Sequence, residues 1–147
     1  MKRYQDDSIQ SRFMKVIHLY YRRAFEIFRE TEIHPKQVPL MLLLDEHAGM
    51  SQKEISQELN ISPPTVAVSV KRLEKAGFVE RRPDENDQRM SRISLTPQGR
   101  EIIEEAKACI EENESLMFKG FSESEICLLK RFFEQMITNL GEDGRTE

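Results

Sequence analysis

Apolar residues recur at helical spacing at both ends of the chain and in its middle, and they alternate with polar residues in one short segment. Near the start, Ile9, Phe13 and Ile17 open a series that returns every three or four positions up to residue 28. Near the end, a heptad-like seam comprises Ile126, Leu129, Phe133, Met136 and Leu140. Residues 92–95 (RISL) alternate with a period of two. The pattern predicts a mainly α fold with a small β-hairpin.

Residues 51–76 predict two short helices joined by a tight turn. Ser51 and Glu54 have capping-box spacing at the start of the first helix, which ends near residue 59. Asn60 stands in the turn, where a left-handed backbone is required and Asn tolerates it. Ser62 is a good N-cap for the second helix, and Pro63 takes its first position, where no N–H is needed. This is the helix-turn-helix pattern, although helical bundles also contain such pairs.

The second of these helices has one apolar face and one face suited to nucleic acid. Val66, Val70 and Leu73 recur at i, i+4 and i+7, which predicts a buried stripe. The opposite face offers small groups near its start and cations farther along, where base edges and phosphates can be met. Its members are Pro64, Thr65, Val68, Lys71, Arg72 and Lys75.

A β-hairpin with a charged tip is predicted directly after this helix. Residues 78–82 and 92–95 form its strands, and residues 83–90 (PDENDQRM) connect them. Four arginines fall within twelve residues here, namely Arg81, Arg82, Arg89 and Arg92. Arginine binds phosphates and fits a narrow minor groove, and Asp87 is placed to pair with the Arg89 guanidinium. The whole segment predicts a winged helix-turn-helix that contacts DNA, with a merely solvated loop as the alternative.

Residues 87–96 (DQRMSRISLT) with 97–99 (PQG) resemble the wing and exit signature of the MarR-type transcriptional regulators. Residues 72–81 (RLEKAGFVER) are similar to the end of their recognition helix, and the resemblance covers most of the chain. It implies a homodimeric winged-helix regulator, usually a repressor, that binds double-stranded DNA. It also implies release by a small anionic or phenolic effector or by oxidation.

The resemblance assigns roles to individual positions. Asp87 and Arg89 match the family's wing-tip pair, which places Arg89 in the minor groove. Thr65 matches a base- or phosphate-contacting position, and Arg72 matches a backbone-facing one. Val68 departs from the polar or basic residue of many members, and valine can only pack on a thymine methyl. The predicted DNA-binding residues are Ser62, Pro64, Thr65, Val68, Lys71, Arg72, Arg82, Asp87, Arg89 and Arg92.

The length predicts a single domain over residues 1–147. Within it, residues 35–96 form the winged helix-turn-helix region, and residues 1–34 and 97–147 form a helical dimerisation region. The terminal apolar stripes exceed what one small winged region covers, although packing within one subunit is the alternative. The predicted dimer interface comprises Ile9, Phe13, Ile17, Ile126, Leu129, Phe133, Met136 and Leu140. A two-fold dimer would present two recognition helices about 34–36 Å apart to a pseudo-palindromic operator.

The net charge of −4 is unusual for a DNA-binding protein, but its distribution resolves the conflict. Residues 51–100 carry nine Lys/Arg and seven Asp/Glu, whereas residues 101–147 carry five and twelve. The acidic residues therefore concentrate outside the proposed DNA face, and the modest basic patch predicts strongly salt-dependent binding.

Other functions find little support in the sequence. No phosphate-binding loop, nucleophile elbow or HExxH motif occurs, so we expect no enzymatic activity and no cofactor. His18, His34 and His47 are too scattered for a local metal site. The longest apolar run, residues 39–44, is far below the ~20 residues that span a bilayer, and no signal peptide is seen, so a cytoplasmic location is expected. Neither Cys109 nor Cys127 has a local cationic cluster that would lower its pKa, and both are predicted to be buried.

Effector-binding residues are not assigned from the sequence. His18, Tyr21, Arg22 and His47 are candidates for a cleft beside the winged region, each with an ordinary alternative as a rim or core residue. The operator, the effector, the regulated genes and the sign of regulation do not follow from the sequence. The alternative function is a helical protein–protein adaptor that uses the winged region without DNA, against which the arginine-rich hairpin argues.

Overall fold

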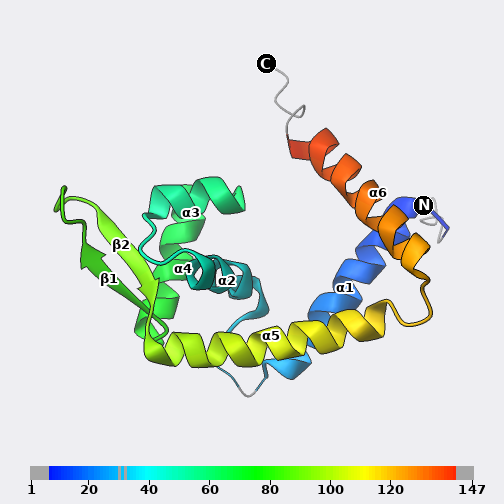
Figure 1. The fold of residues 1–147 in the computed structure, drawn as a ribbon, viewed down its shortest axis with the longest axis horizontal. Helices are drawn as coiled ribbons and strands as arrows, with labels where there is room; N and C mark the ends of the chain where they lie inside the picture. Colours follow the sequence, from blue (N-terminus) through cyan, green and yellow to red (C-terminus); the bar gives the residue numbers. More distant parts are fainter. Residues whose placement is uncertain (1–6, 30, 32, 142–147) are drawn as a thin grey trace, which may run out of the picture. The chain divides into compact units, whose positions relative to one another are not determined.

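The computed structural model describes residues 7–29, 31 and 33–141 of the chain (Figure 1). Contacts divide the chain into two compact units, residues 1–113 and 114–147. The first unit contains α1 (Ile9–Ile27), the short 3-10 helix η1 (Pro35–Gln37), α2 (Val38–Glu46), α3 (Gln52–Leu59), α4 (Pro63–Lys75), β1 (Val79–Pro83) and β2 (Ser91–Leu95). Helix α5 (Pro97–Met117) crosses the boundary, and α6 (Glu123–Gly141) lies in the second unit. The predicted mainly α fold with a two-stranded hairpin is confirmed.

The ends of α3 and α4 are capped as the sequence predicts. The Glu54 N–H donates to Ser51 Oγ at 3.2 Å, and the Ser51 N–H donates back to Glu54 Oε2 at 3.0 Å, which completes the capping box. Asn60 ends α3 with a left-handed backbone at φ 50°. Ser62 Oγ then accepts the Thr65 N–H at the start of α4, where Pro63 is the first helical residue. These local signals set the turn between the two helices.

Strand β2 of the hairpin also forms an isolated antiparallel β-bridge with the segment that precedes α3. Strands β1 and β2 are antiparallel, with Arg81 opposite Ile93 and Arg82 opposite Arg92. The Ile93 N–H donates to the Met50 carbonyl at 2.8 Å, and the Met50 N–H donates back to the Ile93 carbonyl at 3.1 Å. The segment that precedes α3 therefore extends the sheet and holds the hairpin against the helix-turn-helix.

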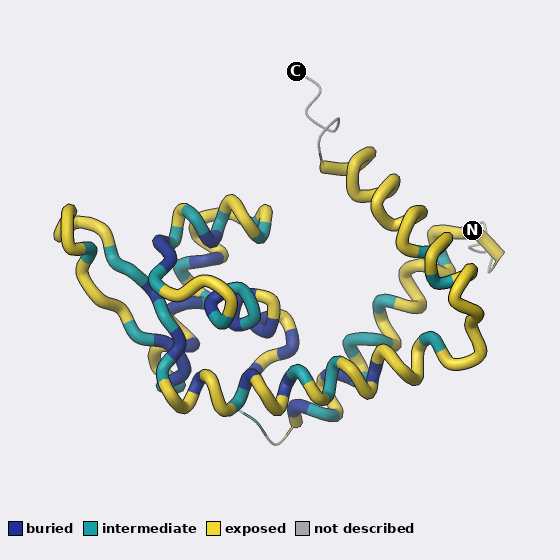
Figure 2. Tube along the Cα trace, viewed as in Figure 1, coloured by how far each residue is buried: buried dark blue, intermediate teal, exposed yellow. Residues whose placement is uncertain are grey.

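One hydrophobic core joins helices α1 to α5 and both strands of the hairpin. The predicted stripe of Val66, Val70 and Leu73 is fully buried, and the core also takes in Ile93 of β2 and Ile103 of α5. Figure 2 shows the buried positions concentrated in α2, α4 and the hairpin, while α6 is exposed along most of its length. The core thus fixes α4 by one face and leaves its other face free.

Two cysteine predictions need correction. Cys127 lies exposed on α6 and Cys109 is only half-buried on α5, so neither is the fully buried residue that was expected. Burial nevertheless raises the pKa of the Cys109 thiol, and Glu112 and Glu105 add to the effect. The thiol form is a weak nucleophile, so Cys109 has no feature of a reactive cysteine. Among the described residues, no helix is both long and apolar enough to cross a membrane.

Gly99 lets the first turn of α5 lie directly on the link between α4 and β1. Thr96 Oγ1 donates to the Gly77 carbonyl at 2.6 Å and accepts the Gly99 N–H at 3.0 Å. The Thr96 N–H donates to the Phe78 carbonyl at 3.0 Å. A Cβ added at Gly99 would lie 2.0 Å from that same carbonyl oxygen. Only glycine permits this approach, because the clashing atom belongs to the backbone and cannot rotate away.

We predict that Gly99→Ala lowers the free energy of unfolding by about 1–3 kcal/mol or more, as overpacking of a close contact does. The measurement is urea unfolding followed by circular dichroism. Gly141→Ala is the matched control, since a Cβ there meets no atom within 4 Å. Equal stabilities of the two variants would contradict the assigned role of Gly99.

Candidate nucleic-acid interface

The exposed face of α4 presents a mixed small and cationic surface. Every predicted contact residue on this helix is exposed, including Val68, whose exposed fraction is 52%. Ser62 Oγ lies 2.7 Å from Thr65 Oγ1, so these two hydroxyls bond to each other beside the helix start. Lys71 and Arg72 follow farther along the helix, and neither forms an ion pair with another described residue. The face therefore offers small groups near its N-terminus and unpaired cations beyond, which suits a groove flanked by phosphates.

A hollow beside α4 is lined in part by a lysine that the sequence patterns did not single out. It has a volume of about 610 Å³ and is lined by Thr65, Val68 and Arg72 of α4 together with Tyr21 and Lys36. Lys36 lies in η1 and is far from α4 in the sequence. No local motif marks Lys36, because only the tertiary fold places it near the recognition helix. We add it to the candidate interface.

Acidic neighbours hold most of the arginines of the hairpin. Arg81 Nε lies 3.1 Å from Glu74 Oε2, and Arg82 Nη2 lies 2.9 Å from Glu80 Oε1. Arg92 is paired with two acids at once. Three of the four arginines of the predicted cluster therefore have an acidic partner in the free chain. Among the described residues of the hairpin, Arg89 is the arginine without an acidic partner.

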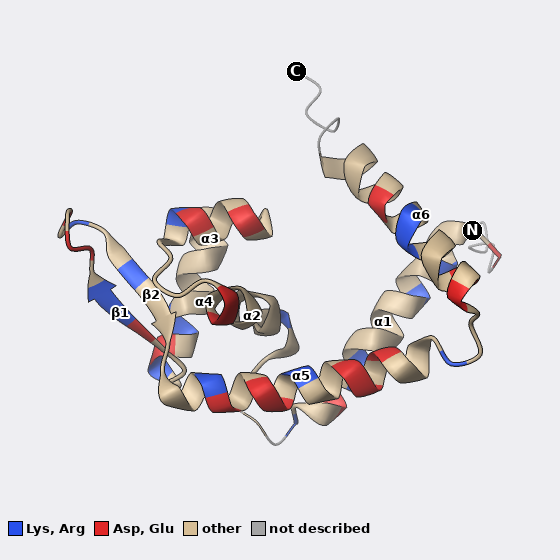
Figure 3. Ribbon diagram, in the orientation of Figure 1, with Lys and Arg blue, Asp and Glu red and all other residues tan. Residues whose placement is uncertain are grey.

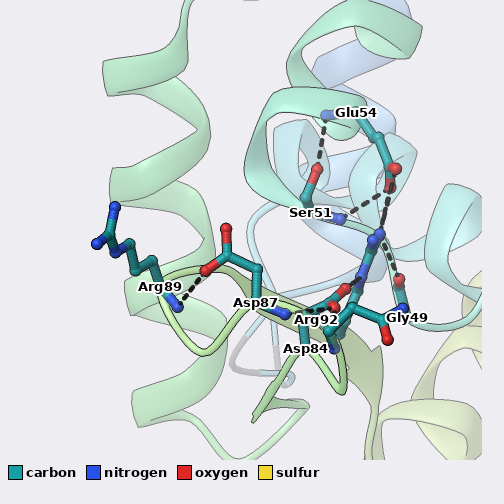
Figure 4. Close-up of polar contacts among 8 residues, drawn as sticks. Gly49, Ser51, Glu54, Asp84, Asp87, Arg89 and Arg92 are labelled. Carbon is teal, nitrogen blue, oxygen red and sulfur yellow. Dashed lines mark hydrogen bonds and ion pairs between the residues drawn. The ribbon is translucent and has the colours of Figure 1, made fainter.

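Asp87 and Arg89 interact differently from the prediction. The Asp87 carboxylate accepts the backbone N–H of Arg89 at 3.0 Å, and it does not pair with the guanidinium. Figure 4 shows the Arg89 side chain extending away from the other labelled residues. Asp87 thus shapes the turn and leaves the exposed Arg89 guanidinium free to meet a ligand.

Arg92 lies between the hairpin and the start of α3. Its Nε donates to Asp84 Oδ2 at 2.6 Å, and its Nη1 donates to Glu54 Oε2 at 3.0 Å and to the Gly49 carbonyl at 3.3 Å. The pKa of Asp84 is lowered, first by the backbone N–H of Asn86 and then by Arg92. The pKa of Glu54 is lowered, first by the backbone N–H of Ser51 and then by Arg92. Both acids are therefore ionised at neutral pH, and both form ion pairs that hold the Arg92 side chain between the hairpin and the start of α3.

The charges are segregated along the first unit. Acidic residues recur along much of the α5 ribbon, as Figure 3 shows, whereas the exposed face of α4 carries Lys71, Arg72 and Lys75. Lys107 of α5 is held by Asp45 of α2 at 2.6 Å and by Glu104 at 2.8 Å. Negative net charge therefore coexists with a locally cationic interface.

Two hollows lie beside α1, on the side of the chain where an effector cleft was expected. An apolar cavity of about 190 Å³ is lined by Tyr20, Tyr21, Phe28 and other side chains of α1, α2 and α5. An open groove of about 480 Å³ is lined by His18, Tyr21, Arg22 and Lys36, with Met14, Ile17 and Phe25 as its apolar part. Three of the four effector candidates thus line one groove. His47 lies at the end of α2 and is not among the residues that line either hollow.

Among the described residues, no group of three or more His, Cys, Asp or Glu side chains could hold a metal ion.

Known proteins similar to this chain share one class of function. A model of the MarR family matches residues 33–91. The HTH-type transcriptional regulator BilQ of Clostridium symbiosum is 28% identical over 132 residues, which span 86% of this chain and 87% of BilQ. The uncharacterised HTH-type transcriptional regulator YsmB of Bacillus subtilis is 30% identical over 110 residues, which span 75% of this chain and 75% of YsmB. The structure of the MepR–DNA complex from S. aureus matches with a TM-score of 0.84 at 23% identity, covering 92% of this chain and 99% of MepR, and shows the same fold.

These relatives are transcriptional regulators and not enzymes, and the matched segment contains the helix-turn-helix and most of the hairpin described above. The same match favours DNA over the adaptor hypothesis. The chain therefore belongs to the MarR family of DNA-binding, winged-helix transcriptional regulators.

Proposed function

We propose that this protein is a homodimeric repressor that binds a pseudo-palindromic operator and is released by a small effector. In this proposal the winged helix-turn-helix region is residues 35–96, and residues 1–34 and 97–147 serve dimerisation. The observation that carries the proposal is the exposed, cationic face of α4 next to a hairpin whose tip presents the unpaired Arg89. α4 would enter the major groove and Arg89 the adjacent minor groove.

Arg89→Ala should weaken binding to the operator by about tenfold and lower the slope of log K against log salt by about one, since one arginine contact with DNA is lost. The measurement is fluorescence anisotropy at several salt concentrations. The duplex is one that the wild-type protein selects from a random library, and a scrambled duplex measures non-specific binding.

Lys119→Ala removes the same charge from an exposed position in the second unit and should bind as the wild type does. If Arg89→Ala bound the selected duplex as tightly as Lys119→Ala, the role of the wing tip would be refuted.

Large apolar side chains left exposed by a single chain support the homodimer. On α1, Ile9 is 83% exposed and Phe13 is 43% exposed, and Ile17 is half-buried. On α6, Phe133, Met136 and Leu140 are exposed, and Ile126 and Leu129 are half-buried. Monomeric proteins rarely leave such continuous apolar stripes in water. A second copy of the chain is the occupant we propose for both stripes.

Phe133→Asp should convert a dimer into a monomer at micromolar concentration, because an aspartate in an apolar interface has no partner. Sedimentation equilibrium measures the change. Thr138→Asp adds the same charge at an exposed position of α6 outside the predicted seam and should remain a dimer. A wild-type protein that sediments as a monomer at tens of micromolar would exclude the proposed interface.

The hollows beside α1 support release by a small aromatic acid or phenol. A cavity of about 150 Å³ is large enough for a benzene ring, and the cavity here has about 190 Å³. Tyr21 lines both the cavity and the groove, whose rim adds Arg22 and Lys36. Ala24 of α1 and Phe28, which follows the last residue of α1, belong to the core of the winged region. A ligand at this place would bias the position of α1 and so the separation of the two recognition helices in a dimer.

Benzoate and phenol at millimolar concentration are the probes for this site. We expect both to raise the melting temperature and to release the selected duplex, since a ligand that binds the folded state stabilises it. Arg22→Gln should abolish the benzoate shift and keep the phenol shift. Arg12→Gln, on the same helix but outside the lining, should leave both unchanged. If Arg22→Gln kept the full benzoate response, the groove would not be the anion site.

A further inference from the structure

A continuous chain of hydrogen bonds runs from the start of α3 to the tip of the hairpin (Figure 4). It begins at the capping box, where Glu54 Oε2 accepts the Ser51 N–H at 3.0 Å. Arg92 Nη1 donates to the same carboxylate, at 3.1 Å to Oε1 and 3.0 Å to Oε2. Arg92 Nε then donates to Asp84 Oδ2 at 2.6 Å. One guanidinium thus joins the helix-turn-helix to the first residue of the wing turn.

The chain continues through Asp84 into the backbone of the turn. Asp84 Oδ1 accepts the N–H groups of Asn86 at 2.8 Å and Asp87 at 3.2 Å. Asp87 Oδ1 in turn accepts the Arg89 N–H at 3.0 Å. The Asp84 N–H closes the turn by donating to the Met90 carbonyl at 2.8 Å. The backbone from which the Arg89 side chain projects is therefore fixed by Asp84 and Asp87.

Arg92 is badly placed to act as a phosphate ligand of its own. Its side chain is 34% exposed, and its Nε and Nη1 already donate to protein oxygens. Two carboxylates lie at hydrogen-bond distance from the guanidinium, so a phosphate that approached it would meet negative charge. The predicted role of Arg92 in direct DNA contact is not supported by this geometry.

We infer that Arg92 is a positioning residue, which with Glu54 and Asp84 clamps the wing to the start of α3 and thereby sets where Arg89 meets the minor groove. This inference rests on the proposed function of Arg89. The clamp connects the two parts of the protein that must enter neighbouring grooves of the DNA. One part is α4, which packs against α3, and the other is Arg89 at the tip of the hairpin. The clamp sets the position of Arg89 relative to α4 already in the free protein. The wing therefore loses little conformational entropy when DNA binds.

Whether an acid-to-amide substitution raises or lowers the affinity for DNA distinguishes a clamp from a simple effect of net charge. Asp84→Asn removes a negative charge near DNA, which by charge alone strengthens binding. In a clamp, the same change replaces the acceptor for Arg92 by an amide and weakens binding. Glu85→Gln removes the same charge from the neighbouring exposed position and takes part in none of the hydrogen bonds of the clamp. It is the matched control.

The experiment measures binding of full-length wild type, Arg89→Ala, Arg92→Gln, the double variant Arg89→Ala/Arg92→Gln, Asp84→Asn and Glu85→Gln to the selected duplex over a salt series. We expect Arg92→Gln and Asp84→Asn to bind about threefold to tenfold more weakly, the range for a lost hydrogen bond between charged groups. Glu85→Gln should bind as tightly as wild type or slightly tighter. The double variant should match Arg89→Ala within about twofold, with a salt slope lower by about one and not two.

A second measurement follows the wing in the free protein. Hydrogen exchange of the amides of Asn86, Asp87 and Arg89 should be severalfold faster in Arg92→Gln and Asp84→Asn, because their acceptors are released. Arg89→Ala keeps its backbone N–H and should exchange like wild type. If Arg92→Gln lowers global stability, Asp84→Asn carries the test, because it is isosteric and lies in the wing turn.

The results separate the clamp from the proposed function. Weakening by Arg89→Ala with wild-type binding by Arg92→Gln and Asp84→Asn would overturn the clamp and leave the wing-tip role intact. A double variant whose loss equals the product of the single losses, with the slope lower by about two, would show that Arg92 contacts phosphate itself. Tighter binding by Asp84→Asn would also overturn the clamp. Wild-type binding by Arg89→Ala would refute the proposed role of Arg89, and the inference about Arg92 would fall with it.

Discussion

The burial of Ile93 is the constraint on which both halves of the interface depend. This side chain is fully buried, and its backbone exchanges two hydrogen bonds with Met50 in the segment before α3. Successive side chains of a strand point to opposite faces, so Ile93 in the core forces Arg92 to the other side of the hairpin. There it meets Glu54 at the start of α3. A shift of one residue in the pairing would bury Arg92 and expose Ile93, and the wing would lose its attachment.

The electrostatic organisation of the winged region follows from this arrangement. Acidic partners hold Arg81, Arg82 and Arg92. The attraction for a polyanion is left to the other cations of the candidate interface, which are Lys36, Lys71, Arg72, Lys75 and Arg89. A chain of net charge −4 can therefore present a cationic surface of limited area. Such a surface favours modest affinity for arbitrary DNA, because few phosphates are neutralised and few counterions are released.

Helix α1 has two different halves, which is why it is central to the proposed regulation. At the end of the helix Ala24 is buried in the core, as is Phe28, the first residue after the helix. At its start Ile9 and Phe13 are exposed. The tyrosines between these halves line the cavity. One helix thus connects a surface proposed for a second copy, a hollow proposed for an effector and the core that carries α4. A displacement of α1 would be transmitted to α4, because a closely packed core has few voids to absorb it.

The sequence by itself determined the elements and their caps. The capping box at Ser51, the left-handed Asn60, the N-cap Ser62 and the alternation of residues 92–95 are local features, and each predicted a boundary to within about one residue. Local sequence suffices here because caps and periodicity act over a few residues. Only the tertiary structure decided which charges are available. The partners of Arg92 lie 38 and 8 residues away, and Lys36 reaches the α4 hollow from outside the helix-turn-helix. A run of arginines does not reveal which of them are neutralised, because ion pairs depend on distances in space that the fold alone sets.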